Sequence, residues 1–198
     1  RGLHRFVGVP GTVGGGVYMN AGCHGGEWAD VVRSVTVADA RGADRVIPRA
    51  EVAFGYRDSG LAGLVVLETE VELEPADPAA MQAEVAELFR WRQEGTPFNQ
   101  PCCGSVFRNP GGPSWQRREG PRTAGQLIEA AGLKGTRIGG AEISPMHANY
   151  FVNTGGATAA DVRALIALAR ERVQQTFDVH LATEVKIVRP DGSFEPPV

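Results

Sequence analysis

The chain has 198 residues, of which 42% are hydrophobic and 22% are charged, and its formal net charge is −3. That composition is typical of a globular protein with a buried core, and the charge excludes the basic surface expected of a nucleic-acid-binding protein. No apolar run approaches the roughly 20 residues that a membrane helix requires, so no membrane insertion is expected.

The N-terminal part of the chain predicts a glycine-rich loop followed by a β-hairpin. Residues 9–16 are rich in glycine and predict the loop, and residues 17–20 predict a short strand or a buried turn. Residues 32–38 alternate between apolar and polar side chains, turn at 39–42 and return through 45–47. This alternation on both sides of a turn predicts a hairpin.

The clearest strand pattern spans residues 65–73. One face carries Leu67, Thr69, Val71 and Leu73, and glutamates alternate with them on the other face. The pattern predicts a sheet with one side in solvent.

An amphipathic helix is predicted at 78–92. Asp77 is a suitable N-cap, and Pro78 suits the first helical position. Apolar side chains recur there at helical spacing, namely Met81, Val85, Leu88 and Phe89.

The C-terminal half begins with a long irregular segment at 95–122, and a segment of that length in a compact domain is usually functional. It is followed by a helix, a strand, a second helix and a final strand, predicted at 123–132, 148–152, 158–173 and 184–188. The Pro, Gly and Ser content of the tail at 190–198 predicts disorder.

The order of these elements predicts an α+β protein with two domains. The region from 1 to 75 is rich in β-structure, and the region from 76 to 198 mixes helices with strands, so the boundary is expected near 75–77. The chain lacks an initiator Met and begins just before the glycine-rich loop, which suggests a fragment of a longer protein.

The cysteines and histidines predict no metal site. Cys23, Cys102 and Cys103 are odd in number, and two of them are adjacent, which fits neither a disulfide framework nor metal-ligand spacing. The four histidines are scattered. Free thiols fit a reducing environment, so a cytoplasmic location is expected.

Two glycine clusters are candidates for anion binding. Residues 11–16 lack the Lys-Ser/Thr of a phosphate-binding loop and the spacing of a dinucleotide-binding motif, so on the motif alone a structural turn is the more common explanation. A second cluster follows at 20–22 and 25–26. Two such loops can present backbone N–H groups to an anion, which favours a ligand site.

Two further segments carry candidate catalytic side chains. Arg57 lies beside an aromatic residue and an aspartate, where it makes either a surface ion pair or a two-pronged contact with a substrate carboxylate. Ser105 follows Gly104, whose flexibility can turn the hydroxyl towards a cleft. Without a G-x-S-x-G elbow a hydrolase nucleophile is not expected, and Ser105 is either a proton donor or a turn residue.

The last candidates lie in the C-terminal half. Residues 131–141 place Lys134 and Arg137 among glycines, and polar side chains follow at 147–153. This arrangement suits a diphosphate and a sugar, and it is also consistent with an ordinary cationic loop. Glu184 opens an apolar segment, where a solvated strand edge is the common explanation.

The joint order of these motifs closely resembles the UDP-N-acetylenolpyruvoylglucosamine reductase family, in the type II form without the extra insertion in the substrate domain. The matching blocks span residues 6–188 and are Gly8–Gly15, Tyr18–Gly22, Phe54–Arg57, Gly104–Pro110, Gly132–Gly135, Ile138–Ala141, His147–Asn149 and Glu184–Ile187. The resemblance implies the second half of a vanillyl-alcohol-oxidase-type FAD-binding domain at 1–75. It implies an α+β domain that binds the UDP-sugar at 76–198, and an absent N-terminal flavin subdomain.

The same resemblance implies a reaction in peptidoglycan precursor synthesis. NADPH would be the hydride donor, FAD the cofactor, and UDP-N-acetylglucosamine enolpyruvate the substrate that becomes UDP-N-acetylmuramate. Arg57 would hold the substrate carboxylate, Glu184 would help to polarise it, and Ser105 would protonate the adjacent carbon.

Binding residues follow from the resemblance as well. The implied flavin contacts are Pro10, Gly11, Thr12, Gly14, Gly15, Asn20, Ala21 and Gly22. The implied substrate contacts are Tyr56, Lys134, His147 and Asn149.

Two alternatives stay open at this point. A different flavin enzyme, such as an alcohol oxidase, explains the glycine loops but leaves the 104–110 block unexplained. A truncated, non-catalytic UDP-sugar-binding module would not require Arg57, Ser105 and Glu184 together.

Overall fold

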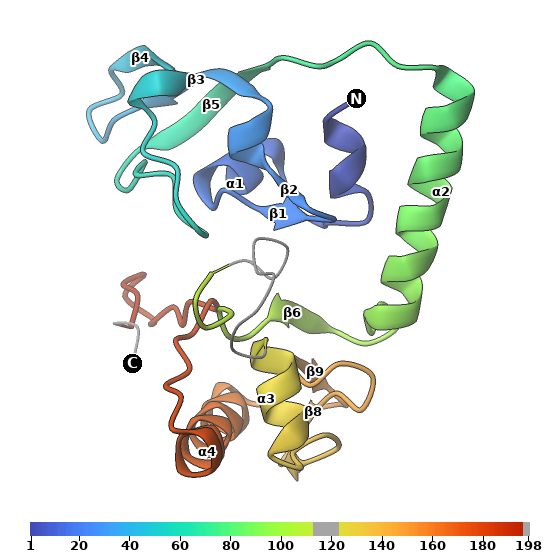
Figure 1. Ribbon diagram of the computed structural model, residues 1–198. Helices are drawn as coiled ribbons and strands as arrows, with labels where there is room; N and C mark the ends of the chain where they lie inside the picture. The colour runs from blue at the N-terminus through green and yellow to red at the C-terminus, as the bar shows by residue number, and fades with distance from the viewer. Residues whose placement is uncertain (113–122, 196–198) are drawn as a thin grey trace. The chain divides into compact units, whose positions relative to one another are not determined.

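The computed structural model describes residues 1–112 and 123–195. The chain forms two compact units, Arg1–Arg92 and Gln93–Val198, each with its own hydrophobic core. The division falls at the end of a long helix, whereas the composition placed the boundary near 75–77. Figure 1 shows both units.

The first unit is built around a three-stranded antiparallel sheet with the strand order β4-β3-β5. Val35 of β3 lies opposite Ile47 of β4 and Thr69 of β5, which confirms the predicted hairpin. In chain order, its elements are η1 Leu3–Phe6, α1 Val13–Tyr18, β1 Gly22–Cys23, β2 Gly26–Glu27, η2 Trp28–Asp30, β3 Val32–Ala38, β4 Asp44–Pro48, η3 Arg49–Glu51, β5 Val65–Val71 and α2 Pro78–Gly95.

Helix α1 replaces the predicted loop at 13–16 and the first half of the predicted strand or turn at 17–20, whereas residues 9–12 are irregular and 19–20 form a turn, as expected. Thr12 caps the helix by accepting a hydrogen bond from the Gly15 N–H. A Cβ atom at Gly16 would collide with the indole ring of Trp28. Gly16 therefore lets the helix pack directly on a core tryptophan. The glycines that predicted a turn serve here to allow a close contact between a helix and a side chain.

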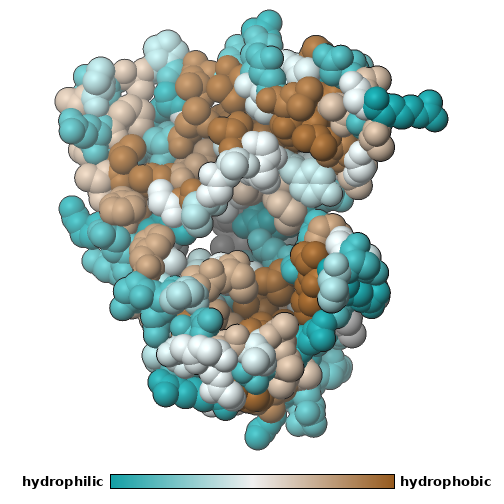
Figure 2. All heavy atoms as spheres, turned by 180° about the vertical axis from the view of Figure 1, so that it is seen from behind, coloured by the Kyte–Doolittle hydropathy of each residue, from teal (hydrophilic) through white to brown (hydrophobic). Residues whose placement is uncertain are grey.

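Strand β5 also differs from its predicted pattern, because a β-bulge changes which side chains face the core. Thr36 pairs with Glu68 and Val37 pairs with Val66, so Leu67 is an extra residue in the ladder. Its side chain is 57% exposed. The strict alternation predicted for 65–73 is therefore wrong at Leu67. Figure 2 shows hydrophobic side chains at the surface of the first unit.

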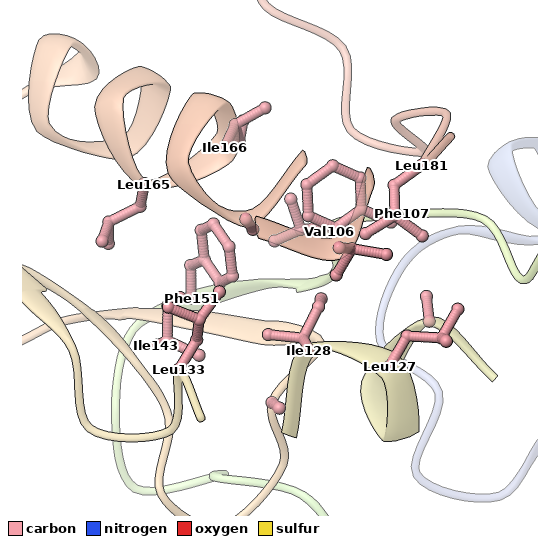
Figure 3. Close-up of a cluster of buried hydrophobic side chains, with 14 of the residues drawn as sticks. Val106, Phe107, Leu127, Ile128, Leu133, Ile143, Phe151, Leu165, Ile166 and Leu181 are labelled. Atoms are coloured by element: carbon pink, nitrogen blue, oxygen red, sulfur yellow. The ribbon is translucent and has the colours of Figure 1, made fainter. Parts of the chain in front are cut away.

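The second unit places two helices against a four-stranded antiparallel sheet with the strand order β6-β9-β8-β7. The buried side chains from the helices and the sheet form one cluster, in which the rings of Phe107 and Phe151 meet edge to face at 6.1 Å (Figure 3). The elements are β6 Cys102–Ser105, α3 Ala124–Ala130, β7 Arg137–Ile138, β8 Ala141–Ile143, β9 Tyr150–Asn153 and α4 Ala159–Phe177.

The two helices of this unit begin where the sequence predicts. Thr123 caps α3 and Thr158 caps α4, each with a reciprocal capping box. The predicted helix at 78–92 is also present, as α2.

The predicted final strand at 184–188 is absent from the described residues. The segment is held instead by isolated bridges, Phe107 with Thr183 and Val188 with Phe194. The Arg189 N–H donates to the Ser193 carbonyl and closes a turn, where the composition predicted disorder. The rest of the expected disordered tail, 196–198, and part of the expected long loop, 113–122, lie outside the described residues.

Candidate active site

The predicted site residues divide between the two units. Arg57 belongs to the first unit, with the two glycine clusters, whereas Ser105 and Glu184 belong to the second. Each group is described within its own unit.

Arg57 contacts the second glycine cluster directly. Its Nη2 atom donates to the Gly22 carbonyl at 3.1 Å and its Nη1 atom to the Asn20 carbonyl at 3.5 Å. The guanidinium lies 5.0 Å from the centroid of the Tyr56 ring, a cation–π contact. Arg57 itself has a φ of 57°, the left-handed region that non-glycine residues enter at a cost. The structure therefore joins the candidate carboxylate-binding Arg to the candidate flavin-binding loop.

Asn20 fixes that loop from inside. Its side chain has no exposed surface, its Oδ1 accepts from the Ala29 N–H at 2.9 Å, and its Nδ2 donates to the Gly55 carbonyl at 2.9 Å. The amide is thus used within the protein. The Ala21 backbone is used within the protein as well, because its N–H donates to the Gly16 carbonyl and its carbonyl accepts from the Trp28 N–H.

The first glycine cluster exposes a stretch with little side-chain bulk. Pro10, Gly11 and Thr12 are exposed, and a Cβ atom at Gly11 would meet nothing within 4 Å. Gly14 and Gly15 form the first turn of α1. The Gly15 N–H is used by the Thr12 cap, so the N–H groups at Val13 and Gly14, which have no acceptor within the helix, are the donors that this turn can present to a negatively charged group.

In the second unit, Ser105 and Glu184 lie on two segments that are hydrogen-bonded to each other through the Val106 carbonyl. The Val106 carbonyl accepts from the Glu184 N–H at 2.8 Å and from the Val185 N–H at 3.3 Å. Ser105 is half-buried at the end of β6, after Gly104 with its φ of 77°. The two predicted catalytic residues are therefore neighbours across adjoining backbone.

Asn149 holds the segment that follows Ser105. Its Oδ1 accepts from the Phe107 N–H at 2.9 Å, and its Nδ2 donates to the Phe107 carbonyl at 2.8 Å. Like Asn20, this predicted contact residue uses its side-chain amide within the protein.

Glu184 also lines a cleft of about 430 Å³. Four cationic side chains and two carboxylates line the same cleft, with apolar side chains between them. The cations are Arg108, Arg163, Arg170 and Lys186.

Two arginines of α4 that line this cleft were missed in the sequence. Arg163 and Arg170 are seven residues apart, which places them on one face of the helix, and this spacing was the available signal. Arg163 forms an ion pair with Glu195. Arg170 donates from Nε to the Leu181 carbonyl at 2.9 Å, and burial lowers its pKa from the ordinary value.

Lys134 and His147 form a second polar group in this unit. Lys134 Nζ lies 2.8 Å from the Glu129 carboxylate. His147 accepts from the Asn149 N–H through Nδ1 at 3.1 Å, and its ring meets that of Tyr150 edge to face at 4.9 Å. Burial lowers the pKa of His147, and the charge of Lys134 acts in the same direction. The imidazole is therefore neutral near pH 7 and offers its Nε2–H as a donor.

Within residues 1–112 and 123–195, no three His, Cys, Asp or Glu side chains gather in a way that could hold a metal ion. Over the same residues, every helix is too short or too polar to cross a membrane.

Comparisons with known proteins point to one family. Residues 96–188 match the family model of the UDP-N-acetylenolpyruvoylglucosamine reductase C-terminal domain. The chain is 46% identical over 188 residues to the UDP-N-acetylenolpyruvoylglucosamine reductase of Alkalilimnicola ehrlichii, covering 94% of this chain and 60% of that protein. It is 45% identical to that of Anaeromyxobacter dehalogenans over 196 residues, covering 98% of this chain and 56% of that protein.

A solved structure agrees with the sequence matches. The crystal structure of the reductase from Thermus caldophilus aligns with a TM-score of 0.75 at 37% identity, over 91% of this chain and 62% of that one. This chain thus spans about 60% of the length of such relatives. The motifs, the fold and the matches agree, and the chain belongs to the UDP-N-acetylenolpyruvoylglucosamine reductase family.

Proposed function

We propose that the protein carrying this chain reduces UDP-N-acetylglucosamine enolpyruvate to UDP-N-acetylmuramate, with FAD as cofactor and NADPH as hydride donor, in the synthesis of peptidoglycan precursors. The observation that carries the proposal is the pair of hydrogen bonds from Glu184 and Val185 to the Val106 carbonyl. They set a carboxyl group and the Ser105 hydroxyl on adjoining segments, as proton transfer beside a substrate carboxylate requires.

The cleft beside Glu184 supports an anionic substrate. Arg108, Arg170 and Lys186 line it together with Glu184, so positive charge is available where a diphosphate or a carboxylate would approach. The apolar part of the lining can exclude water, which strengthens electrostatic interactions inside the site.

Three side chains have distinct roles in this proposal. Arg57 binds the substrate carboxylate and stabilises the negative charge that develops beside it. Glu184 polarises the same carboxylate, which requires that it be protonated or paired with a cation. Ser105 donates its proton to the adjacent carbon, and Arg108 or Lys134 stabilises the alkoxide that remains.

The first unit has features that suit FAD, which when bound supplies the hydride that NADPH provides. The exposed stretch at 10–12 lacks bulky side chains, and Gly14 and Gly15 lie in the first turn of α1. Both features suit a pyrophosphate that is held by backbone N–H groups. The loop at 20–22 is the third contact in this proposal, and Arg57 fixes its shape by donating to the Asn20 and Gly22 carbonyls.

The remaining residues have supporting roles. Tyr56 lies against Arg57, and Lys134 and the neutral His147 offer donors to the UDP-sugar. In this proposal the segment at 1–75 serves the flavin and the segment at 76–198 serves the sugar nucleotide, while the free thiols suit a reducing cytoplasm.

The experiment is an assay of NADPH oxidation with added FAD, in the presence and absence of UDP-N-acetylglucosamine enolpyruvate. It uses the full product of the reading frame that contains this chain. Oxidation that depends on the sugar supports the proposal. A folded, flavin-loaded protein that binds the sugar without oxidising NADPH would point to a binding module and would refute the reductase.

Ser105→Ala tests the proton donor in the same assay. General acid catalysis contributes about 10²–10⁴-fold, so sugar reduction should slow by roughly that factor while flavin reduction by NADPH continues. Ser193→Ala, at an exposed serine in the C-terminal turn, is the control and should match the wild type. An unchanged rate in Ser105→Ala would remove Ser105 from the mechanism.

A further inference from the structure

Residues 106–107 connect the end of β6 to Arg108, and this short segment lacks a continuous strand partner. The β6–β9 ladder shifts register between Cys102 and Ser105, next to Gly104 with its left-handed backbone. Val106 and Phe107 follow, and both are buried. Buried backbone N–H and C=O groups require partners, so this segment must find its hydrogen bonds outside a regular ladder.

Asn149 supplies several of those bonds. It is only 3% exposed, and its side chain donates to the Phe107 carbonyl and accepts from the Phe107 N–H. Its own carbonyl accepts from the Val106 N–H at 2.8 Å. A carboxamide carries one acceptor and one donor group, so this side chain satisfies both backbone groups of Phe107 as a strand partner would.

The bonds of Asn149 lead to both proposed catalytic residues of this unit. On one side, Ser105 directly precedes Val106 and Phe107, the two residues that Asn149 holds. On the other, the Val106 carbonyl accepts from the Glu184 N–H. The displacement of Val106 and Phe107 would therefore move the Ser105 hydroxyl and the Glu184 carboxyl at once.

Asn149 is itself fixed in place. Its N–H donates to the His147 ring, and the next residue, Tyr150, pairs with Ser105 across β6 and β9. Ala148 and Phe151 on either side belong to the hydrophobic cluster. The asparagine can therefore transmit the position of the core to the segment that it holds.

From this arrangement we infer that Asn149 is a positioning residue, which sets the distance between the Ser105 hydroxyl and the Glu184 carboxyl through the backbone of Val106 and Phe107. The inference rests on the proposed function, and it gives Asn149 a task other than contact with the substrate. Its loss should slow the step that uses Ser105 and Glu184, and should spare both flavin reduction and substrate binding.

The test compares Asn149→Ala, Asn149→Asp and Asn153→Ala with the wild type in the full-length flavin-loaded protein. Asn153 is a matched control, because it ends β9 just as Asn149 precedes it, and its side chain also accepts from two backbone N–H groups, those of Gly155 and Ala157. Stopped-flow measurements follow flavin reduction by NADPH and flavin reoxidation by the enolpyruvyl sugar separately, and thermal melting reports stability.

For Asn149→Ala, reoxidation at saturating sugar should slow by roughly 10- to 100-fold, the loss that a misplacement of about 1 Å can cause. KM should change by less than about threefold, because uniform binding is retained, and flavin reduction should stay at the wild-type rate. Asn149→Asp keeps the acceptor for the Phe107 N–H but sets a carboxylate oxygen against the Phe107 carbonyl, so it should slow reoxidation at least as much as Asn149→Ala. Asn153→Ala should reoxidise at the wild-type rate.

Other outcomes overturn the inference in recognisable ways. A higher KM at an unchanged maximal rate would make Asn149 a substrate contact. A lower melting temperature at an unchanged reoxidation rate would make its role purely structural, and Asn149→Asp decides the matter if Asn149→Ala does not fold. If the wild type itself is not reoxidised by the sugar, the proposed function fails and the inference with it. Active wild type with equally active Asn149 variants would remove the inference alone.

Discussion

Asn20 combines a fully buried side chain with a φ of 43°. Asparagine is among the few residues that enter the left-handed region routinely, because its short polar side chain forms local hydrogen bonds. Here that side chain joins η2 at Ala29 to the turn at Gly55. A single residue therefore fixes the geometry of the loop that Arg57 contacts.

Replacement of Asn20 by Ala and by Gly should separate the contribution of its side-chain hydrogen bonds to stability from the contribution of its left-handed backbone conformation. Asn20→Ala leaves a buried donor and a buried acceptor without these bonds, at about 1–3 kcal/mol for each unsatisfied group, and it adds backbone strain of about 1–2 kcal/mol. Asn20→Gly removes the side chain without the strain. Urea unfolding should rank the wild type first, Gly next and Ala last. Equal losses in Ala and Gly would show that the backbone conformation is not strained.

The two buried asparagines also show where sequence reasoning stops at this scale. The polar blocks around Asn20 and Asn149 stood out in the sequence, and both residues were interpreted as ligand contacts. The sequence does not show which way a side chain points, and in the structure both amides bond to backbone within the protein. The contact of the Arg57 guanidinium with the carbonyls of the glycine loop was not predicted, because the resemblance to the family implied only a role for Arg57 at the substrate carboxylate.

At the scale of elements, α1 depends on which of its glycines faces the core. A Cβ atom at Gly16 would collide with Trp28, whereas a Cβ atom at Gly14 would meet Val66 at 3.5 Å, an ordinary contact. Glycine within a helix costs roughly 0.5–1 kcal/mol relative to alanine. The same substitution should therefore have opposite effects at these two positions.

Gly16→Ala should destabilise the first unit, by about 1–3 kcal/mol for overpacking, while Gly14→Ala should be neutral or should stabilise it by up to about 1 kcal/mol. Chemical unfolding followed by Trp fluorescence measures both variants. Equal destabilisation by the two substitutions would contradict the close packing of α1 on Trp28.

The cap of α4 should make stability sensitive to acid. The Thr158 N–H donates to the Asp161 carboxylate at 2.9 Å and is the main cause that holds the pKa of Asp161 below its ordinary value of 3.8. The folded state thus favours the charged form. This contribution is complete above the ordinary pKa and is lost as the pH falls through the lower pKa of the folded state.

Asp161→Asn should reduce that acid dependence. Unfolding free energies measured at about pH 6 and about pH 3 should fall less between the two conditions in the variant than in the wild type. An identical fall in both proteins would show that Asp161 does not contribute to acid sensitivity.

The elements themselves followed from the sequence wherever local chemistry decided them. The hairpin of β3 and β4, helix α2 and the capped starts of α3 and α4 were all predicted, because alternation and capping are local signals. The bulge at Leu67 depends on pairing with a distant strand. The prediction of a strand at 184–188 was wrong for a similar reason, because the hydrogen-bond partner of this segment is the Val106 carbonyl and not a neighbouring strand.

At the scale of the whole molecule, two hydrophobic clusters stabilise two units. Ile47 is 5% exposed in the first cluster, and Ile128 is fully buried in the second. The same Ile→Ala substitution can therefore be compared in both cores, at an expected cost of about 2–5 kcal/mol in each.

Hydrogen exchange should show that each substitution acts mainly on its own unit. Ile47→Ala should reduce the protection of the amides of β3, and Ile128→Ala that of the amides of β9. A comparable loss of protection in both units from either substitution would mean that the chain unfolds as one cooperative body.

The bonds to the Val106 carbonyl have a consequence for how this sequence can drift over generations. Main-chain atoms make the contacts between the two segments, since the Arg108 N–H donates to the Ala182 carbonyl and the Glu184 N–H donates to the Val106 carbonyl. A change of side chain at Ala182 leaves these main-chain contacts intact. One inserted or deleted residue there would shift the Glu184 N–H away from the Val106 carbonyl. Natural variation should therefore exchange the residue at Ala182 more readily than it changes the number of residues between Ala182 and Glu184.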